Sequence, residues 1–335
     1  MRRKSVLFAA LLILAAVVVV LGSRLFAGGP AQDVQTRGSG DSPRTSSRPA
    51  EVQLGQNASL GGRRPFPDDN PWNVDISHEP VDPNSDAYIS SIGATARLHP
   101  DFGFIWQGAL CGIPYVVVPG DQPTVPVQFR YASESDRGPY PIPADPPTDP
   151  EERHILMIDR DNWKLYELIG AQKKDDVWHA AAGAVFDLSS NDLRPAGWTS
   201  TDAAGLPVFP GLVRYDEVME QKEIRHALRF TTTRTRRAYV HPARHFASRA
   251  TDPALPPMGL RVRLKASYDI SSFPASAQVI LTALKKYGMM LADNGGNWFL
   301  SGTADSRWPS KEIDTLKRVK GSDFEVISVG NVVTR

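Results

Sequence analysis

Prolines and glycines divide this chain into short apolar runs, and this punctuation limits the folds it can adopt. The 335 residues include 28 prolines and 26 glycines. Proline interrupts both helices and strand ladders, and glycine favours turns, so long regular elements are not expected. The runs between them are mostly of strand length, with few strand–helix–strand alternations. The pattern predicts a mainly β fold: a single β-sandwich or jelly-roll-like domain with a few peripheral helices.

The expected strands follow runs rich in β-branched and aromatic residues. They cover residues 102–106, 113–118, 125–131, 154–159, 163–169, 177–188, 224–233 and 261–265. Helices are expected at residues 85–92, 215–222, 272–288 and 311–319, with Ser272 and Ser310 as N-caps. A hairpin is expected between residues 289–292 and 298–300.

A basic start and a long apolar run indicate that the chain is exported. Arg2, Arg3 and Lys4 precede residues 6–21, which contain no charged or strongly polar side chain. We predict that residues 1–27 are a signal peptide or a signal anchor; both stay open, because the run is close to the roughly 20 apolar residues that span a membrane. Basic residues stay inside, so we expect an extracytoplasmic protein, secreted or anchored to the membrane by its N-terminal helix alone.

The composition changes after this segment. Residues 36–49 consist almost entirely of Ser, Thr, Gly, Pro, Asp and Arg, and contain almost nothing that can enter a core. We therefore predict a flexible, disordered linker at residues 28–64 and a single globular β-rich domain at residues 65–335.

Overall charge and missing motifs exclude several classes of function. The 38 basic and 37 acidic residues give a net charge of +1, so nucleic acid is not an expected partner. Cys111 is the only cysteine, which excludes an intrachain disulfide, and we expect it to be buried in the core. Nucleotide-binding and His-Glu-x-x-His motifs are absent. Pro242 opposes a helical zinc site between His241 and His245, so no cofactor or metal is expected.

Several sequence blocks are distinctive. They are Asn70–Asn73, Gly197–Pro207, Pro210–Glu217, His226–Thr231, Pro256–Arg261 and Ala292–Gly295. Together they resemble a group of uncharacterised secreted or membrane-anchored bacterial proteins. The resemblance covers nearly the whole globular part and implies a single domain there. It implies no activity and no catalytic residue.

The segment from Arg225 to Arg249 is unusually basic. It contains seven arginines and three histidines, with no Asp or Glu. Arginine binds carboxylate, sulfate or phosphate through two parallel hydrogen bonds, so this segment is a candidate anion site. The alternative is a pair of solvent-facing strands whose arginines pair with acids elsewhere. The candidate substrate-binding residues are Arg229, Tyr239, His241, Arg244 and His245, with Trp198 and Trp298 as aromatic platforms for sugar rings.

Scattered carboxylates supply candidates for acid–base chemistry. Cleavage of a glycosidic bond requires two carboxyl groups across a groove, one protonated and one ionised. The candidate catalytic residues are Asp202, Asp216, Glu217, His226 and Asp293, and Asp187 is a further carboxylate to consider. For each carboxylate alone, a cap, turn or salt bridge is the structural alternative, and His226 fits a buried core histidine equally well.

Three functions are compatible with these features. The first is a glycoside hydrolase acting on an anionic polysaccharide or cell-envelope glycan. The second is a polysaccharide lyase, in which an arginine neutralises a uronate carboxylate and His241 or Tyr239 removes the adjacent proton. The third is a non-catalytic glycan-binding or envelope module that uses the same basic segment. Convergence of the carboxylates with the histidines in one cleft favours hydrolysis.

Overall fold

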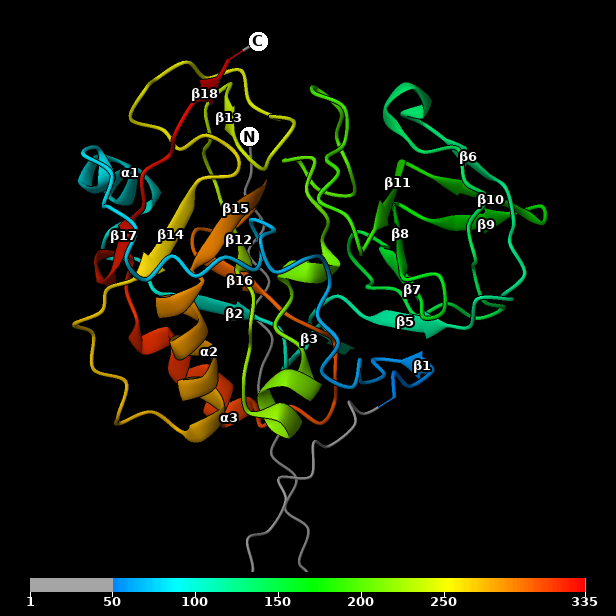
Figure 1. Ribbon diagram of the computed structural model, residues 1–335, viewed down its shortest axis with the longest axis horizontal. Helices are drawn as coiled ribbons and strands as arrows, with labels where there is room; N and C mark the ends of the chain where they lie inside the picture. Colours follow the sequence, from blue (N-terminus) through cyan, green and yellow to red (C-terminus); the bar gives the residue numbers. More distant parts are fainter. Residues whose placement is uncertain (1–50, 335) are drawn as a thin grey trace, which may run out of the picture. The chain divides into compact units, whose positions relative to one another are not determined.

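Strands dominate the computed structural model, which describes residues 51–334 (Figure 1). The prediction of a mainly β fold is therefore confirmed. The predicted signal at residues 1–27 and most of the predicted linker lie outside the described residues. Among the described residues, no helix is both long and apolar enough to cross a membrane.

One mixed sheet contains five strands in the order β1-β5-β7-β8-β11. Their bounds are Gly55–Gln56 (β1), Tyr115–Val118 (β5), Ile155–Asp159 (β7), Lys164–Ile169 (β8) and Ala182–Asp187 (β11). The strands predicted at residues 154–159 and 163–169 are confirmed as β7 and β8, an antiparallel pair with Ile158 opposite Leu165. Residues 51–64, which the sequence placed in the linker, instead pack on this sheet: β1 pairs with β5, and Leu60 is buried.

A second mixed sheet contains six strands in the order β17-β14-β15-β12-β16-β2. Their bounds are Phe324–Val326 (β17), Arg261–Leu264 (β14), Met289–Asn294 (β15), Leu228–Thr232 (β12), Phe299–Ser301 (β16) and His99–Asp101 (β2). Strands β12 and β15 are parallel, as are β16 and β2. A wholly antiparallel sandwich or jelly roll has no such pairs, so that finer prediction is not confirmed.

The predicted hairpin of residues 289–300 is wrong, because β12 lies between β15 and β16. The loop that joins them instead crosses the end of β12. Thr231 Oγ1 donates to Gly296 O at 2.8 Å, and Thr233 N donates to Asn297 Oδ1 at 2.9 Å. At Gly295 a Cβ would lie only 2.7 Å from Thr231 Oγ1, so glycine permits this close crossing.

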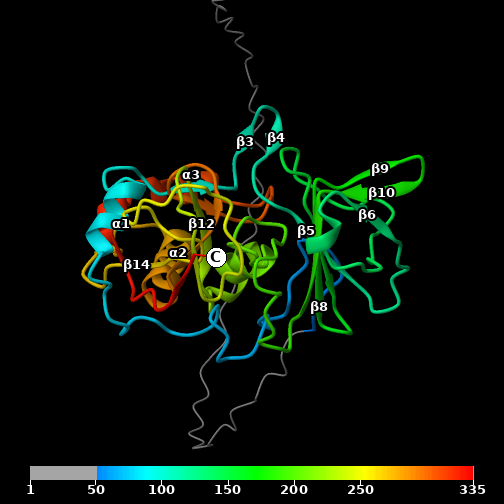
Figure 2. The same ribbon diagram turned by 90° about the horizontal axis from the view of Figure 1, so that it is seen from above.

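Three small sheets complete the strands. They are β6-β10-β9 (Val127–Phe129, Val177–Ala180, Gln172–Lys174), β3-β4 (Ile105–Trp106, Ala109–Leu110) and β13-β18 (Tyr239–Val240, Val332–Val333). The run predicted as one strand at residues 177–188 is thus two, β10 and β11, in different sheets. Hairpin β3–β4 stands out between the part of the fold that contains β12 and the part that contains β5 (Figure 2).

Helices are short. Helix α1 (Ser85–Ile92) matches the prediction, and α2 (Ala275–Lys286) begins later than predicted, with Pro274 as its N-cap. Helix α3 (Ser310–Asp314) continues into a 3-10 turn, and Ser310 is its first residue instead of its cap. A π-helical turn spans Asp216–Gln221, and further 3-10 turns lie at Ala132–Glu134, Phe209–Gly211 and Gly321–Asp323.

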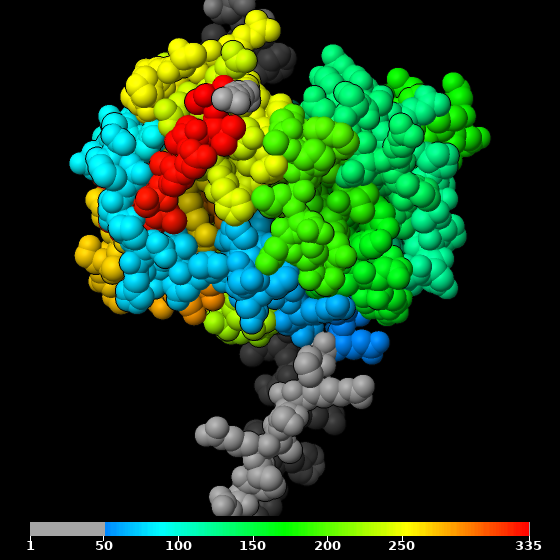
Figure 3. Space-filling model, turned by 45° about the horizontal axis from the view of Figure 1, so that its top comes forward, coloured from blue at the N-terminus to red at the C-terminus, as the bar shows by residue number. Residues whose placement is uncertain are grey.

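The main core surrounds the six-stranded sheet. Trp298 is fully buried there, stacked between Phe230 and Phe324 at centroid distances of 5.5 and 5.2 Å. A smaller cluster that includes Tyr140 and Met157 packs on the other side of β7. At the surface, the C-terminal segment in red lies beside the yellow residues that include its partner β13 (Figure 3).

Candidate functional site

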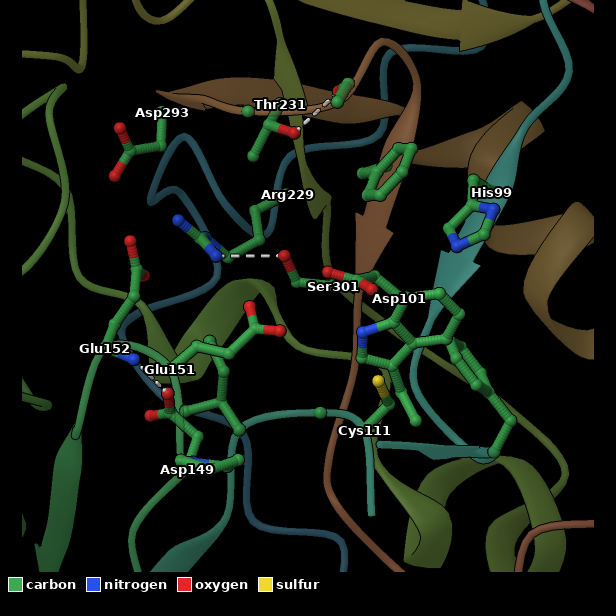
Figure 4. A pocket seen from close by; sticks show the side chains of 18 of the residues that line it. His99, Asp101, Cys111, Asp149, Glu151, Glu152, Arg229, Thr231, Asp293 and Ser301 are labelled. Carbon is green, nitrogen blue, oxygen red and sulfur yellow. Dashed lines mark hydrogen bonds between the residues drawn. The ribbon is translucent and has the colours of Figure 1, made fainter. Parts of the chain in front are cut away.

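A cavity of about 700 Å³ opens where the six-stranded sheet meets the loop before β7 and the β3–β4 hairpin (Figure 4). Its charged or titratable lining residues are Asp101, Asp149, Glu151, Glu152, Asp293, Arg229, Lys317, His99 and Cys111. A volume of this size is typical of ligand sites. Five carboxylates around one arginine make it the chemically richest place in the described part of the chain.

Strand register brings the first group of lining residues together. In the parallel pair β2–β16, His99 lies opposite Phe299 and Asp101 opposite Ser301. Side chains two residues apart on a strand share a face, so all four point toward the cavity. On β12 the same alternation directs Arg229 and Thr231 toward the cavity, with Phe230 buried on the other side. The sequence predicted this strand within residues 224–233.

Arg229 lies at the centre of the site and is 95% buried, with an exposed fraction of 5%. Its Nη1 donates to Ser301 Oγ at 2.9 Å, and its Nη2 lies 3.9 Å from Asp202 Oδ2. Its Nε has no hydrogen-bond partner among the described residues. Because this atom is also out of reach of solvent, the guanidinium offers a ligand chiefly its positive charge beside the lining carboxylates.

The carboxylates fall into two groups on either side of Arg229. Figure 4 shows Asp101 and Glu151 pointing into the same space, while Glu152 and Asp293 lie on the other side of the arginine. Burial raises the pKa of Asp101, and the neighbouring Glu151 raises it further. Burial also raises the pKa of Asp293, against the opposing charge of Arg229. Asp101 and Asp293 are therefore biased toward the protonated form.

The loop that carries Glu151 and Glu152 is fixed by Asp149. Its Oδ2 accepts hydrogen bonds from the backbone N–H of Glu152 at 2.7 Å and of Arg153 at 3.2 Å. Its Oδ1 lies 2.8 Å from the backbone N of His154 and 2.9 Å from the Nδ1 of the same residue. Because His154 is buried, this clamp holds both glutamates at the cavity mouth.

Aromatic side chains line the side of the cavity away from this loop. His99 stacks on Phe299, with centroids 4.1 Å apart and an angle of 21°, and Phe104 meets His99 edge-on. Trp106, on the hairpin, also lines the cavity and remains 57% exposed. Rings of this kind pack on the apolar faces of sugars.

Of the predicted catalytic residues, only Asp293 lines the cavity. Asp202 lies behind Arg229 and is buried; its Oδ1 accepts from the backbone N–H of Ala204 and Leu206 at 2.9 and 3.1 Å. Burial raises the pKa of Asp202 to about 8, although Arg229 opposes this. Asp202 therefore supports the arginine from below and does not reach a substrate.

The remaining predicted catalytic residues form a buried ionic cluster elsewhere. Arg214 Nη2 donates to Glu217 Oε1 at 2.5 Å, and His226 Nε2 lies 3.0 Å from Glu217 Oε2. Asp216 Oδ2 accepts from the backbone N–H of Leu60 at 3.1 Å. The cluster holds residues 59–60 on the domain. Its buried ionic contacts are already paired, so the catalytic prediction for Asp216, Glu217 and His226 has no geometric support.

The basic segment does not form one site. The structure places Tyr239, His241, Arg244 and His245 away from the cavity lining. Tyr239 is buried in the β13–β18 pair, and His241 is exposed. Arg244 Nε donates to Arg194 O at 2.8 Å, and His245 Nδ1 lies 2.9 Å from Ala203 O. Of the arginines and histidines of this segment, only Arg229 lines the cavity.

The two tryptophans predicted to stack on sugar rings lie outside the cavity lining. Trp298 is a core residue whose Nε1 donates to Gly93 O at 2.9 Å. Trp198 is half-buried, with the Arg194 guanidinium 5.6 Å from its ring centre. Neither lines the cavity.

Two further expectations are resolved. Asp187 is exposed, and its Oδ1 accepts from Ser189 N at 2.8 Å in a turn. Cys111 lines the cavity and is half-buried, not a core residue as expected. Burial raises the pKa of its thiol to about 11, so it remains a neutral thiol at neutral pH.

Sequence reasoning missed His99, Asp101, Trp106, Glu151 and Glu152. Asp101 and the two glutamates lie at strand ends or in loops before strands, where functional side chains gather, and this was the available signal. Among the described residues, no group of His, Cys, Asp and Glu side chains has an arrangement suited to a metal ion. Comparison with protein-family models, curated proteins and solved structures found no match to this chain.

Proposed function

We propose that the protein is a glycoside hydrolase whose active site is the Arg229 cavity. One observation carries the proposal: half-buried Asp101, with its raised pKa, shares the cavity with exposed Glu151 beside aromatic side chains (Figure 4). Glycosidic cleavage uses two carboxyl groups held in unlike environments.

In this mechanism Asp101 is the general acid. Its proton passes to the glycosidic oxygen as the bond from that oxygen to the anomeric carbon breaks. Glu151 acts from the other side, either by bonding to the anomeric carbon or by taking a proton from an attacking water. Arg229 lines the same cavity, and its positive charge near Asp101 stabilises the carboxylate that remains after proton transfer.

The charges around the cavity favour a neutral or amino-substituted polysaccharide. Even with Asp101 and Asp293 protonated, the three other lining carboxylates outnumber the two lining cations, Arg229 and Lys317. A uronate or sulfate ester would meet this excess of negative charge. The expected anionic substrate rested on the basic segment, and of its arginines and histidines only Arg229 lines the cavity. We therefore propose a neutral or amino-substituted polysaccharide in place of the anionic one expected from the sequence.

A lyase is a second candidate because His99 and Arg229 line the same cavity. Burial lowers the pKa of His99, which favours the neutral imidazole that a base requires. A lyase of this kind acts on a uronate, so this candidate requires a negatively charged sugar to bind beside the lining carboxylates. A non-catalytic glycan-binding module is the third outcome. The export expected from residues 1–27 supports an extracytoplasmic glycan for all three.

The test incubates the full chain with neutral, amino-substituted and anionic polysaccharides, such as cellulose, xylan, chitin, chitosan and polygalacturonate. We expect new reducing ends from a neutral or amino-substituted polymer. We expect no unsaturated product, which would be detected by its absorbance in the far ultraviolet. Glu151→Gln should remove this activity, while Asp187→Asn, an exposed turn residue, serves as the matched control. Unsaturated products support the lyase, and binding without any product supports the binding module.

A further inference from the structure

The β3–β4 hairpin presents apolar side chains to solvent. Ile105 and Trp106 are 65% and 57% exposed, the highest fractions of any large hydrophobic residues in the described part of the chain. Exposed aromatic and aliphatic neighbours of this kind mark interaction sites more often than chance. Packing within the domain does not account for their position.

The hairpin holds these side chains in a defined place. It closes through Gln107 and Gly108, with φ angles of 48° and 83°, in the two-residue turn that matches strand twist. Ile105 pairs with Leu110, and Trp106 pairs with Ala109. Because neighbours on a strand face opposite ways, Trp106 lines the cavity whereas Ile105 does not.

Trp106 extends an aromatic surface that begins inside the cavity. His99 stacks on Phe299, Phe104 meets His99 edge-on, and Trp106, on the hairpin, lines the same cavity. Asp101 lies between this surface and Glu151 (Figure 4). A sugar held by the two carboxylates would therefore have its neighbour in the chain close to the indole ring.

We propose that Trp106 is a stacking platform for a second sugar ring, so that the substrate is a polymer bound at more than one ring. The inference rests on the proposed glycan site and adds a specificity-determining residue to it. The occupant is a sugar because the indole adjoins the carboxylate pair and shares its cavity. A membrane surface and a second copy of the chain are the competing occupants of the exposed tip.

Binding is measured by calorimetry on Asp101→Asn, which cannot turn the ligand over in the proposed mechanism. The probes are the disaccharides and hexasaccharides of cellulose, chitin and chitosan. We expect Trp106→Ala in this background to weaken hexasaccharide binding about tenfold and to leave disaccharide binding within about twofold. Trp106→Phe should restore most of the affinity, and Ile105→Ala should leave it unchanged.

Failure of this inference is distinguishable from failure of the hydrolase. If the wild type releases reducing ends but Trp106→Ala has the same KM for the hexasaccharide, only the platform is lost. If the hexasaccharides bind through Trp106 but no bond is cleaved, the platform stands and the hydrolase is lost. No binding to any probe overturns the platform. Trp106-dependent binding to lipid vesicles, or Trp106-dependent self-association, in place of glycan binding also overturns the platform.

Discussion

At the scale of single residues, buried Glu217 and half-buried Asp101 differ in what surrounds them. Glu217 is enclosed by Arg214 and His226, and its charge is neutralised inside the fold. Asp101 lines a cavity with another carboxylate beside it, and its pKa is raised. Sequence alone gave Glu217 as one of several catalytic candidates and did not include Asp101. Only the pairing of β2 with β16 reveals Asp101.

The pH dependence of activity should reflect Asp101. Because its raised pKa keeps it protonated above the ordinary range of aspartate, kcat/KM should fall as the pH rises through that value. Asp101→Asn should lower kcat/KM roughly a hundred- to ten-thousand-fold and remove this fall. A pH–rate profile checks both. An unchanged alkaline fall in Asp101→Asn would assign it to another group.

Replacement of Glu217 should affect stability instead of chemistry. Glu217→Gln removes the nearer charge partner of buried Arg214 and leaves only Asp216, at 3.8 Å, which costs about 3–5 kcal/mol of unfolding free energy. Denaturant unfolding measures this loss. The rate per folded molecule should stay close to that of the wild type. A fully stable but inactive Glu217→Gln protein would return this residue to the list of catalytic candidates.

At the scale of elements, the loop of residues 149–152 is positioned by its contact with His154. The sequence predicted β7 and β8 well, since their apolar runs are local signals. It did not reveal the clamp before β7, because a hydrogen bond between Asp149 and a buried histidine leaves no periodic pattern. The order of β15, β12 and β16 was missed for a related reason: parallel strands need long connections.

His154→Gln should loosen the loop that carries Glu151 and Glu152. We expect a clear fall in kcat and only a small fall in the melting temperature. Burial lowers the pKa of His154, but the hydrogen bond and charge of Asp149 outweigh this, so the pKa is raised overall. The contribution of His154 to stability is therefore present below about pH 6.5 and is lost as the pH rises through the raised value. Melting temperatures of wild type and variant across this range should converge at alkaline pH. A constant difference at every pH would contradict the account of His154.

At the scale of the whole molecule, stability should depend on one proton held behind the cavity. Asp202 has a pKa of about 8 in the folded chain and about 3.9 in an unfolded one. Between these values the folded state binds the extra proton, so stability falls as the pH rises, by about 1.4 kcal/mol per pH unit for this group alone. Across this pH range, the free energy of unfolding of Asp202→Asn should therefore rise relative to that of the wild type. Parallel unfolding curves at pH values inside it test the sign.

How far the sequence predicts this molecule depends on how local the signal is. The mainly β class, helix α1 and strand β12 were predicted from local patterns of residues. The cavity does not, since Asp101, Glu151, Arg229 and Asp293 are far apart in the chain and meet only through sheet pairing. The basic segment misled the prediction because nearness in sequence was taken for nearness in space.

The most direct test of the central claim compares Asp101→Asn with His241→Ala in one assay of reducing-end release on the polysaccharide that the wild type cleaves. The cavity account predicts that Asp101→Asn loses nearly all activity while folded. It predicts that His241→Ala, at an exposed residue outside the cavity lining, keeps the wild-type rate. The opposite pattern, an active Asp101→Asn and an inactive His241→Ala, would contradict it and place the chemistry in the basic segment.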